Sequence, residues 1–242
     1  FEITPKTKVV FTEGNDLMER NAQFMADYLN LASITSNPTD EKVIELALGL
    51  ENDNKEAYRL EVTKDRVLIT GASEAGVFYG IQTLRKSINS NNTNHTLAPV
   101  TINDSPRFGY RGMMLDVARH YQPVEFVKKF IDLLAMHNIN RFHWHLTEDQ
   151  GWRVEIKQYP KLTELGSERK ETVIGRNTDE YDGKPHGGFY TQEEIKEIVA
   201  YAQERYITSI PEIDLPGHML GALKAYPEYG CTGGPYEVAT SW

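Results

Sequence analysis

The sequence contains almost no cysteine and no long hydrophobic run. Cys231 is the only cysteine among 242 residues, so the chain cannot form an internal disulfide bond. No apolar stretch reaches the about 20 residues that a membrane-spanning helix requires, and the mean hydropathy is -0.51. These absences exclude a disulfide-stabilised fold and a helical membrane span, and they favour a globular protein.

Basic residues are scarce relative to acidic ones. The chain has 26 lysine and arginine residues against 35 aspartate and glutamate residues, for a net charge of -9. Nucleic acids and anionic membranes are bound by basic surfaces that attract phosphate, so we expect neither as a partner. The first residues, Phe1 to Thr4, have neither the basic nor the apolar region of a signal peptide. We expect a secreted or periplasmic protein from which any signal peptide has been removed.

Residues 1–106 are predicted to form a small α/β flanking domain. Strand-like segments at 8–11, 42–50 and 57–72, the last broken by a turn, alternate with two helical patterns. We expect one helix over 16–31, and we expect Ser73 to cap the second. The apolar face of the first helix is predicted to contain Leu17, Phe24, Tyr28 and Leu31, and that of the second Val77, Ile81, Leu84 and Ile88. We find no catalytic pattern in this part and expect a structural role.

Residues 107–242 alternate between strand and helix patterns. Strands are predicted at 111–117 and 207–214, on either side of the strand that contains His143. Pro123 opens one intervening helix, whose apolar face is expected to include Phe126 and Val127, and a capping box starts the other at Thr191. This alternation is typical of a parallel α/β sheet or barrel.

The segment 141–153 carries the strongest functional signal. Alternation along a strand places His143 and His145 on one face and Phe142 and Trp144 on the other. Two carboxylates follow directly, at 148 and 149. A polar interior face that leads to two acids costs free energy unless something binds there, and in barrels the chemistry lies at the carboxyl ends of the strands.

Candidate site residues follow all three strands. Arg119 could hold two adjacent hydroxyls or a carboxylate with its fork of donors, or it could form an ordinary salt bridge. His218 could be a general base, a partner of a carboxylate or a helix cap, and Trp152 could be a sugar-stacking platform or part of the core. Their convergence on one edge of the sheet favours a site. The further candidates are Glu148, Asp149, Glu212 and Asp214.

Several of these segments resemble glycoside hydrolase family 20, the β-N-acetylhexosaminidases. The similarity lies in residues 111–121, 143–152, 187–191 and 211–218, and residues 75–84 resemble the small domain that precedes the catalytic barrel. The resemblance implies an α/β sandwich domain followed by the first part of a (β/α)8 TIM barrel, with about three of its eight strands in this chain. It also implies glycans with a terminal N-acetylhexosamine as the substrate.

The resemblance also implies roles for individual residues. Arg119 matches the arginine that binds the 3- and 4-hydroxyls of the terminal sugar. His218 matches the histidine that bonds the catalytic glutamate, and Glu148 stands where an acid, often aspartate, supports that histidine. We expect supporting roles for Asp149, Asp214, Glu212 and His145, and no cofactor or metal. The implied mechanism is retaining and substrate-assisted, with the N-acetyl oxygen attacking the anomeric carbon.

The catalytic Asp-Glu pair of the family follows a His-x-Gly-Gly motif, which this sequence does not contain. Fewer residues follow Pro106 than the about 250 that a complete barrel needs. We therefore expect a fragment that lacks the general acid and is inactive in isolation.

Two alternatives remain open. His143 and His145 could be ligands of a metal-dependent barrel hydrolase, which would need further ligands. The chain could also be a non-catalytic carbohydrate-binding protein, which would bind sugar without turnover.

Overall fold

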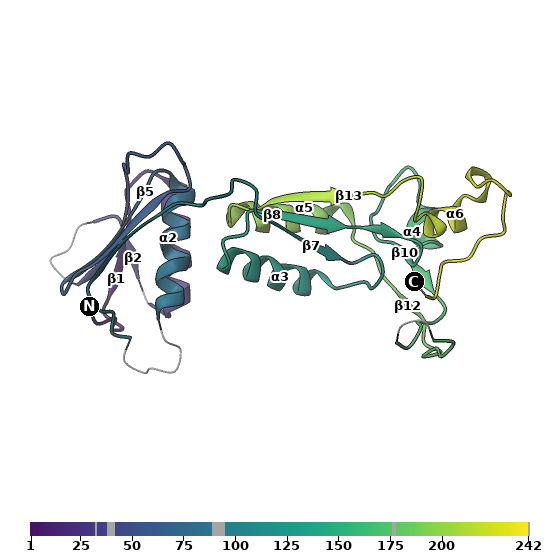
Figure 1. The fold of residues 1–242 in the computed structure, drawn as a ribbon, viewed down its shortest axis with the longest axis horizontal. Helices are drawn as coiled ribbons and strands as arrows, with labels where there is room; N and C mark the ends of the chain where they lie inside the picture. The colour runs from purple at the N-terminus through teal and green to yellow at the C-terminus, as the bar shows by residue number, and fades with distance from the viewer. Residues whose placement is uncertain (32, 38–41, 89–94, 176–177, 242) are drawn as a thin grey trace. The chain divides into compact units, whose positions relative to one another are not determined.

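The computed structural model describes residues 1–31, 33–37, 42–88, 95–175 and 178–241. It divides into two compact units, shown with their elements in Figure 1. Unit 1 contains residues 1–109 with 136–138, and unit 2 contains residues 110–135 with 139–242.

Unit 1 contains a mixed six-stranded sheet in the order β2-β1-β3-β5-β4-β6. Strands β1, β2, β3 and β5 are parallel, and β4 runs antiparallel to both β5 and β6. The short strands β2 and β6 were not predicted from the sequence. The strands are β1 (Lys8–Val10), β2 (Ile34–Thr35), β3 (Val43–Leu48), β4 (Tyr58–Val62), β5 (Arg66–Gly71) and β6 (Val100–Asp104).

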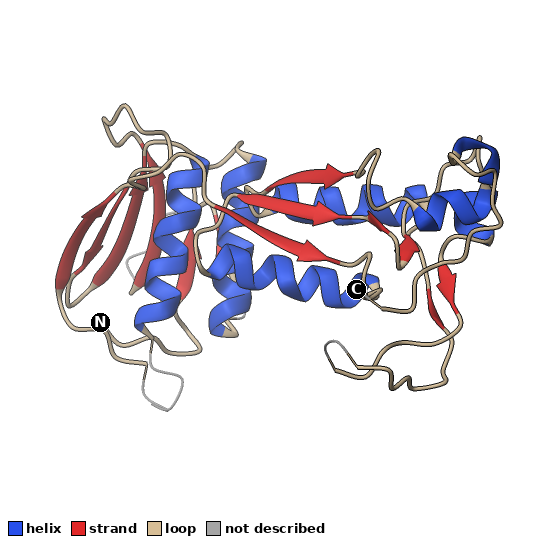
Figure 2. Ribbon diagram, turned by 45° about the vertical axis from the view of Figure 1, so that its right-hand side comes forward, coloured by secondary structure: helices blue, strands red, loops and turns tan. Residues whose placement is uncertain are grey.

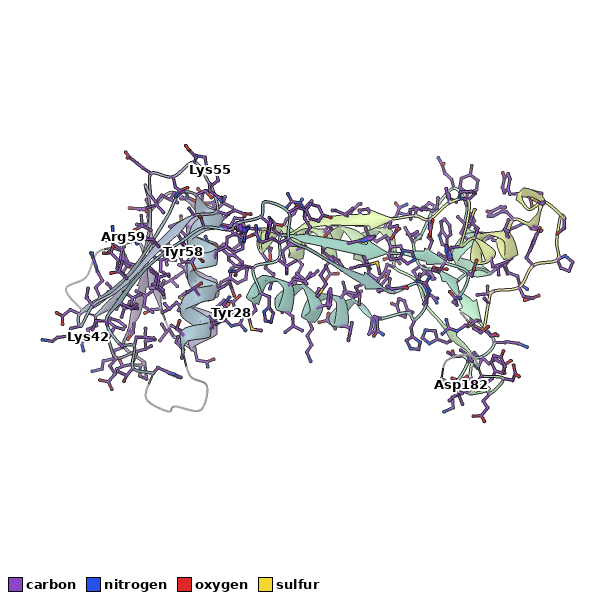
Figure 3. The ribbon with its side chains drawn as sticks, viewed as in Figure 1. Tyr28, Lys42, Lys55, Tyr58, Arg59 and Asp182 are labelled. Carbon is purple, nitrogen blue, oxygen red and sulfur yellow. The ribbon has the colours of Figure 1, made fainter. Side chains whose placement is uncertain are left out.

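Two helices, α1 (Asp16–Leu29) and α2 (Glu74–Ser87), cover one face of this sheet (Figure 2). Alternation along β4 directs Tyr58 toward the helices and Arg59 toward the opposite side (Figure 3). The expected buried stripe of α2 is confirmed at Val77, Ile81 and Leu84, which are all buried, whereas Ile88 lies just past the end of the helix and is half-buried.

Two details of these helices differ from the prediction. Leu17 is 40% exposed, and α1 buries Met18, Ala22 and Met25 instead, a stripe that also follows helical periodicity. The Ser73 hydroxyl does not cap α2. It donates to the Lys55 carbonyl oxygen, a long-range partner that local sequence does not reveal.

Unit 2 is built on three parallel strands in the order β13-β8-β7, drawn as neighbouring arrows in Figure 1. The elements are β7 (Gly112–Asp116), α3 (Val124–Met136), β8 (Arg141–His145), α5 (Gln192–Glu204) and β13 (Thr208–Glu212). The capping box at Thr191 is confirmed: its hydroxyl accepts from the Glu194 N–H and the Glu194 side chain bonds back to the Thr191 N–H.

The core of unit 2 lies on the outer face of β8. Phe142 and Trp144 are fully buried there, as expected from alternation, and their rings contact Phe130 and Tyr190. Helix α3 buries Val127 as predicted, whereas Phe126 is 42% exposed and lies outside the buried stripe.

The segment between β8 and α5 contains several short elements. The hairpin β9–β10 extends directly from β8. None of the described helices is long and apolar enough to cross a membrane. The short elements are β9 (Thr147–Glu148), β10 (Gly151–Trp152), α4 (Lys161–Glu164), β11 (Glu168–Arg169) and β12 (His186–Gly187), and α6 (Leu220–Ala225) follows β13.

Gly76 lies where α2 approaches the backbone of residue 57, and a Cβ atom added there would overlap the Ala57 carbonyl oxygen. Replacing glycine by alanine in a helix normally stabilises it by about 1 kcal/mol. We predict the opposite sign for Gly76→Ala, a loss of about 1–3 kcal/mol of unfolding free energy, because the backbone must shift.

Urea unfolding of the two variants provides the measurement. Gly109→Ala is the control, since a Cβ at Gly109 meets nothing within 4 Å, and its effect should stay within about 0.5 kcal/mol. A stabilising Gly76→Ala would show that α2 does not pack this closely.

Candidate active site

The register of the parallel sheet aligns the carboxyl ends of its three strands. Asp116 of β7 and Glu212 of β13 both pair with His145 of β8. The turns that follow these strands therefore start from the same edge. Active sites of parallel α/β folds form at this edge.

The turn after β7 fixes Arg119 through its own backbone. One oxygen of Asp116 accepts from the N–H groups of Ala118 (3.0 Å) and Arg119 (2.9 Å), and the other accepts from Arg119 Nη1. Arg169 donates to the Arg119 carbonyl oxygen (2.8 Å). The arginine is thus held at its backbone and at its side chain.

Glu148 is the buried centre of the cluster, with only 2% of its surface exposed. Its Oε1 accepts from Arg119 Nη2. Its Oε2 accepts from the Asp149 N–H (2.9 Å) and lies 2.8 Å from His218 Nδ1. A buried carboxylate is tolerated only when its oxygens are paired in this way.

The pKa of Arg119 reflects these partners. Burial acts to lower the pKa of the guanidinium, but the bond to Asp116 and the charge of Glu148 outweigh it and raise the pKa. Arg119 therefore stays positive while 37% of its side chain remains exposed, which leaves part of the guanidinium accessible to a ligand.

His218 has a left-handed backbone conformation, with φ of 54°. This region is unfavourable for a residue with a side chain and is found mostly where the surroundings enforce it. Asp149 supplies part of that enforcement, because its Oδ1 accepts from the Leu220 N–H at 3.1 Å. Half of the His218 side chain is exposed, so its second ring nitrogen can reach another group.

A second cluster joins His143, His145 and Glu212. Glu212 Oε2 lies 2.5 Å from His143 Nε2 and 2.5 Å from His145 Nδ1. The hydrogen bond from His145, with that from His143, lowers the pKa of Glu212. The two imidazoles share one strand face, as alternation predicts.

Two buried arginines hold the loops around the site by donating to backbone carbonyls. Arg153 donates to Ala118, Gln150, Ser167 and Gly188. Its burial, together with Arg169, lowers its pKa to about 10. A Cβ atom at Gly151 would overlap the Arg153 guanidinium and would displace it from these bonds. Arg169 bonds the carbonyls of Arg119 and Gln150.

The structure brings together most of the predicted site residues. Arg119, Glu148, Asp149 and His218 form one connected group, and His145 and Glu212 form the adjacent one. Their roles in binding and catalysis remain predictions. Asp214 differs: β13 ends at Glu212, and among the described residues no hydrogen bond or ion pair joins the Asp214 carboxylate to the cluster. Its N–H donates to Thr147 Oγ1 (2.9 Å).

Trp152, Arg169 and Asp116 have roles that the sequence left open or did not predict. Trp152 is only 7% exposed and donates to the Val154 carbonyl oxygen (2.7 Å), so it belongs to the core and is not an open sugar platform. The carbonyl-binding role of Arg169 was missed, and no sequence pattern marks it. Asp116 could have been recognised as an aspartate placed to bond the N–H groups two and three residues ahead.

Two groups of donors are close enough to consider a metal ion: His143, His145 and Glu212, and Glu148, Asp149 and His218. Ligand atoms of a tetrahedral zinc ion, each about 2.0–2.2 Å from the metal, are about 3.3 Å apart. The 2.5 Å separations in the first group are those of hydrogen-bond partners. In the second group Arg119 already neutralises Glu148. The geometry does not favour the metal-dependent alternative.

Comparison with known proteins gives a consistent result for both units. Residues 108–242 match the model of the glycosyl hydrolase family 20 catalytic domain, and residues 1–105 match domain 2 of the same family. A Beta-hexosaminidase of Porphyromonas gingivalis is 42% identical over 259 residues, covering 100% of this chain and 32% of the relative. A Beta-hexosaminidase of Vibrio furnissii is 47% identical, covering 72% of this chain and 28% of the relative.

Solved structures agree with these matches. The β-N-acetylhexosaminidase of Streptomyces coelicolor A3(2) is 34% identical with a TM-score of 0.88, covering 100% of this chain and 48% of that structure. A Streptomyces plicatus β-hexosaminidase variant, solved with its product GlcNAc, is 35% identical with a TM-score of 0.86 at the same coverage. This chain thus spans about a third of these curated relatives, and its parallel unit is the first part of a (β/α)8 barrel.

The rings of His120 and His186 stack at 3.8 Å beside this site, and His186 Nε2 accepts from the Tyr121 N–H (2.9 Å). Burial, with His120 and Arg169 nearby, lowers the pKa of His186 to about 4. An unfolded histidine takes up its proton near pH 6.5. Between these pH values the unfolded chain binds more protons, so stability falls as the pH falls from about 6.5 to about 4.

We predict that His186→Gln, whose amide oxygen can take the place of Nε2 and still accept from the Tyr121 N–H, weakens this dependence. The difference between the unfolding free energies at pH 7 and pH 5 should be smaller in the variant than in the unaltered chain. His137→Asn, at an exposed position, is the control and should leave the difference unchanged. An equal difference in all three proteins would contradict the role of His186.

Proposed function

This chain belongs to glycosyl hydrolase family 20, and we propose that the protein containing it is a β-N-acetylhexosaminidase. We propose that this enzyme removes a terminal, non-reducing N-acetylhexosamine from glycans by a retaining, substrate-assisted mechanism. The observation that carries the proposal is the position of buried Glu148 between Arg119 and His218. One carboxylate there links a candidate sugar-binding group to a candidate proton-relay group.

The geometry of Arg119 supports a role in sugar binding. Its guanidinium has five N–H donors, and the bonds to Asp116 and Glu148 each use one from a different nitrogen. The remaining donors, on a partly exposed side chain, suit two adjacent hydroxyl oxygens. The two carboxylates fix the plane of the fork and so set the direction in which those hydroxyls are bound.

The geometry of His218 supports a role in tuning an acid. Its Nδ1 faces Glu148 (2.8 Å), which favours a proton on that nitrogen. The opposite nitrogen is then free to bond the carboxyl group of a general acid. A carboxylate–histidine pair behind an acid can adjust its protonation to the working pH.

In the proposed reaction the acetamido oxygen of the substrate attacks its own anomeric carbon while a glutamate protonates the leaving oxygen. Water then opens the cyclic intermediate, and the anomeric configuration is retained. The residues of this chain would bind the sugar through Arg119 and hold the acid through His218. The catalytic Asp-Glu pair of the family has no counterpart in this sequence.

The proposal predicts that Arg119→Lys lowers kcat/KM for a chromogenic N-acetyl-β-glucosaminide in the complete protein. Lysine keeps the charge but loses the planar fork. Losing charge-assisted bonds to the sugar should cost about 2–4 kcal/mol, or roughly 30- to 1000-fold in kcat/KM. Steady-state kinetics of the variant and the unaltered protein give this ratio.

Arg66→Lys is the matched control, because Arg66 forms an exposed salt bridge with Glu45 in unit 1, and its kcat/KM should be unchanged. An unchanged kcat/KM for Arg119→Lys would show that Arg119 forms a structural ion pair and does not bind the sugar. Binding of N-acetylglucosamine by the complete protein without any turnover would instead favour the non-catalytic alternative.

A further inference from the structure

We propose that His145 carries a proton on both ring nitrogens and acts as a positioning residue that bridges Glu212 to Glu148. In the proposed enzyme, the relay behind the general acid would then run from His218 through Glu148 and His145 to Glu212. The protonation of His145 stands on geometry alone, whereas its effect on catalysis rests on the proposed function.

The first nitrogen of His145 is a hydrogen-bond donor. Its Nδ1 lies 2.5 Å from Glu212 Oε2, an oxygen that His143 Nε2 also approaches. An ionised carboxylate can only accept hydrogen bonds. Each imidazole must therefore place a proton on the nitrogen that faces it, which for His145 is Nδ1.

The second nitrogen faces another carboxylate. His145 Nε2 lies 3.7 Å from Glu148 Oε1. It is fully buried and has no hydrogen-bond partner among the described residues. A neutral ring with its proton on Nδ1 would direct the Nε2 lone pair toward this negative oxygen in a site that excludes water. A proton on Nε2 reverses the sign of that interaction.

The charges around His145 favour its cationic form. Glu212 from β13 and Glu148 from β9 contact the two sides of the ring, and His143 contacts it through Glu212. Beyond Glu148, Asp116 and Arg119 from the end of β7 form an ion pair with each other. The positive charge of Arg119 is shared between Asp116 and Glu148, so it does not neutralise the negative charge of Glu212.

The remaining groups of the cluster add to the negative charge. Asp149 lies 3.8 Å from His218, which approaches Glu148 from the opposite side. A protonated His145 therefore balances the cluster. Each oxygen of Glu148 then has two partners. Oε1 faces Arg119 and His145, and Oε2 faces His218 and the Asp149 N–H.

This arrangement has a functional consequence that differs from sugar binding. His145 is 5% exposed and lies behind Glu148, so it cannot contact the substrate through an open surface. Its charge acts on Glu148, and through it on the proton held by His218. Removing that charge should affect proton transfer and leave ground-state binding intact.

Nitrogen-15 NMR of the complete protein with labelled histidine tests the protonation directly. In the unaltered chain at pH 7 we expect both His145 nitrogens to show the chemical shifts and one-bond N–H couplings of an imidazolium. In Glu148→Gln a larger fraction of the His145 rings should have lost the Nε2 proton at the same pH. These rings should be in the neutral form with the proton on Nδ1. A neutral His145 in the unaltered chain at pH 7 would overturn the proposal without reference to any variant.

Kinetics of the complete protein test the consequence. His145→Gln should lower kcat at least about tenfold and shift one limb of the pH–rate profile, with KM nearly unchanged. His137→Gln, at an exposed position, should change neither. A rise in KM with an unmoved profile would overturn the positioning role.

The two failures can be told apart. If the complete protein does not hydrolyse N-acetylhexosaminides, the proposed function fails while the NMR result still decides the state of His145. If hydrolysis occurs but His145 is neutral, the doubly protonated His145 is ruled out while the proposed activity stands.

Discussion

The buried negative charge of Glu148 is the constraint on which the site depends. A carboxylate that is 2% exposed must replace its lost water with donors, and the structure supplies them from three separate segments. Arg119 comes from the turn after β7, the Asp149 N–H from the β9–β10 hairpin, and His218 from the turn after β13. Because breaking a buried pair is far more costly than losing a surface one, this single side chain ties the ends of all three strands together.

The loops around Glu148 are stabilised by a different interaction: buried arginines donate hydrogen bonds to backbone carbonyl oxygens. Arg153 and Arg169 together bind the carbonyls of residues 118, 119, 150, 167 and 188. Those loops have little regular secondary structure, so their carbonyls would otherwise be buried without donors. A rigid backbone at residues 118 and 119 is what lets Arg119 present its fork in one direction.

Much of this arrangement could be predicted from the sequence because it follows local patterns. Alternation placed His143 and His145 on one strand face, and the parallel βα rhythm placed Arg119, Glu148 and His218 at one edge. Features set by distant partners could not be predicted. The carbonyl bonded by Ser73 and those bonded by Arg169 belong to other segments, and helix periodicity alone allowed a stripe through Leu17 as readily as the observed one through Met18. The strand prediction was wrong at its end, because it extended to Asp214 whereas β13 ends at Glu212.

The most direct test of the central claim is a double-mutant cycle between Arg119→Met and Glu148→Gln, measured as unfolding free energy of this chain in urea. Each single variant removes one of the partners of a buried or half-buried charge, so each should destabilise the chain, with the larger loss for Arg119→Met because Glu148 is the more deeply buried of the two. The double variant should be less destabilised than the sum of the two by about 1–3 kcal/mol. Additivity within about 0.5 kcal/mol would mean that the two side chains do not interact, and it would contradict the account of Glu148 as the centre of the site.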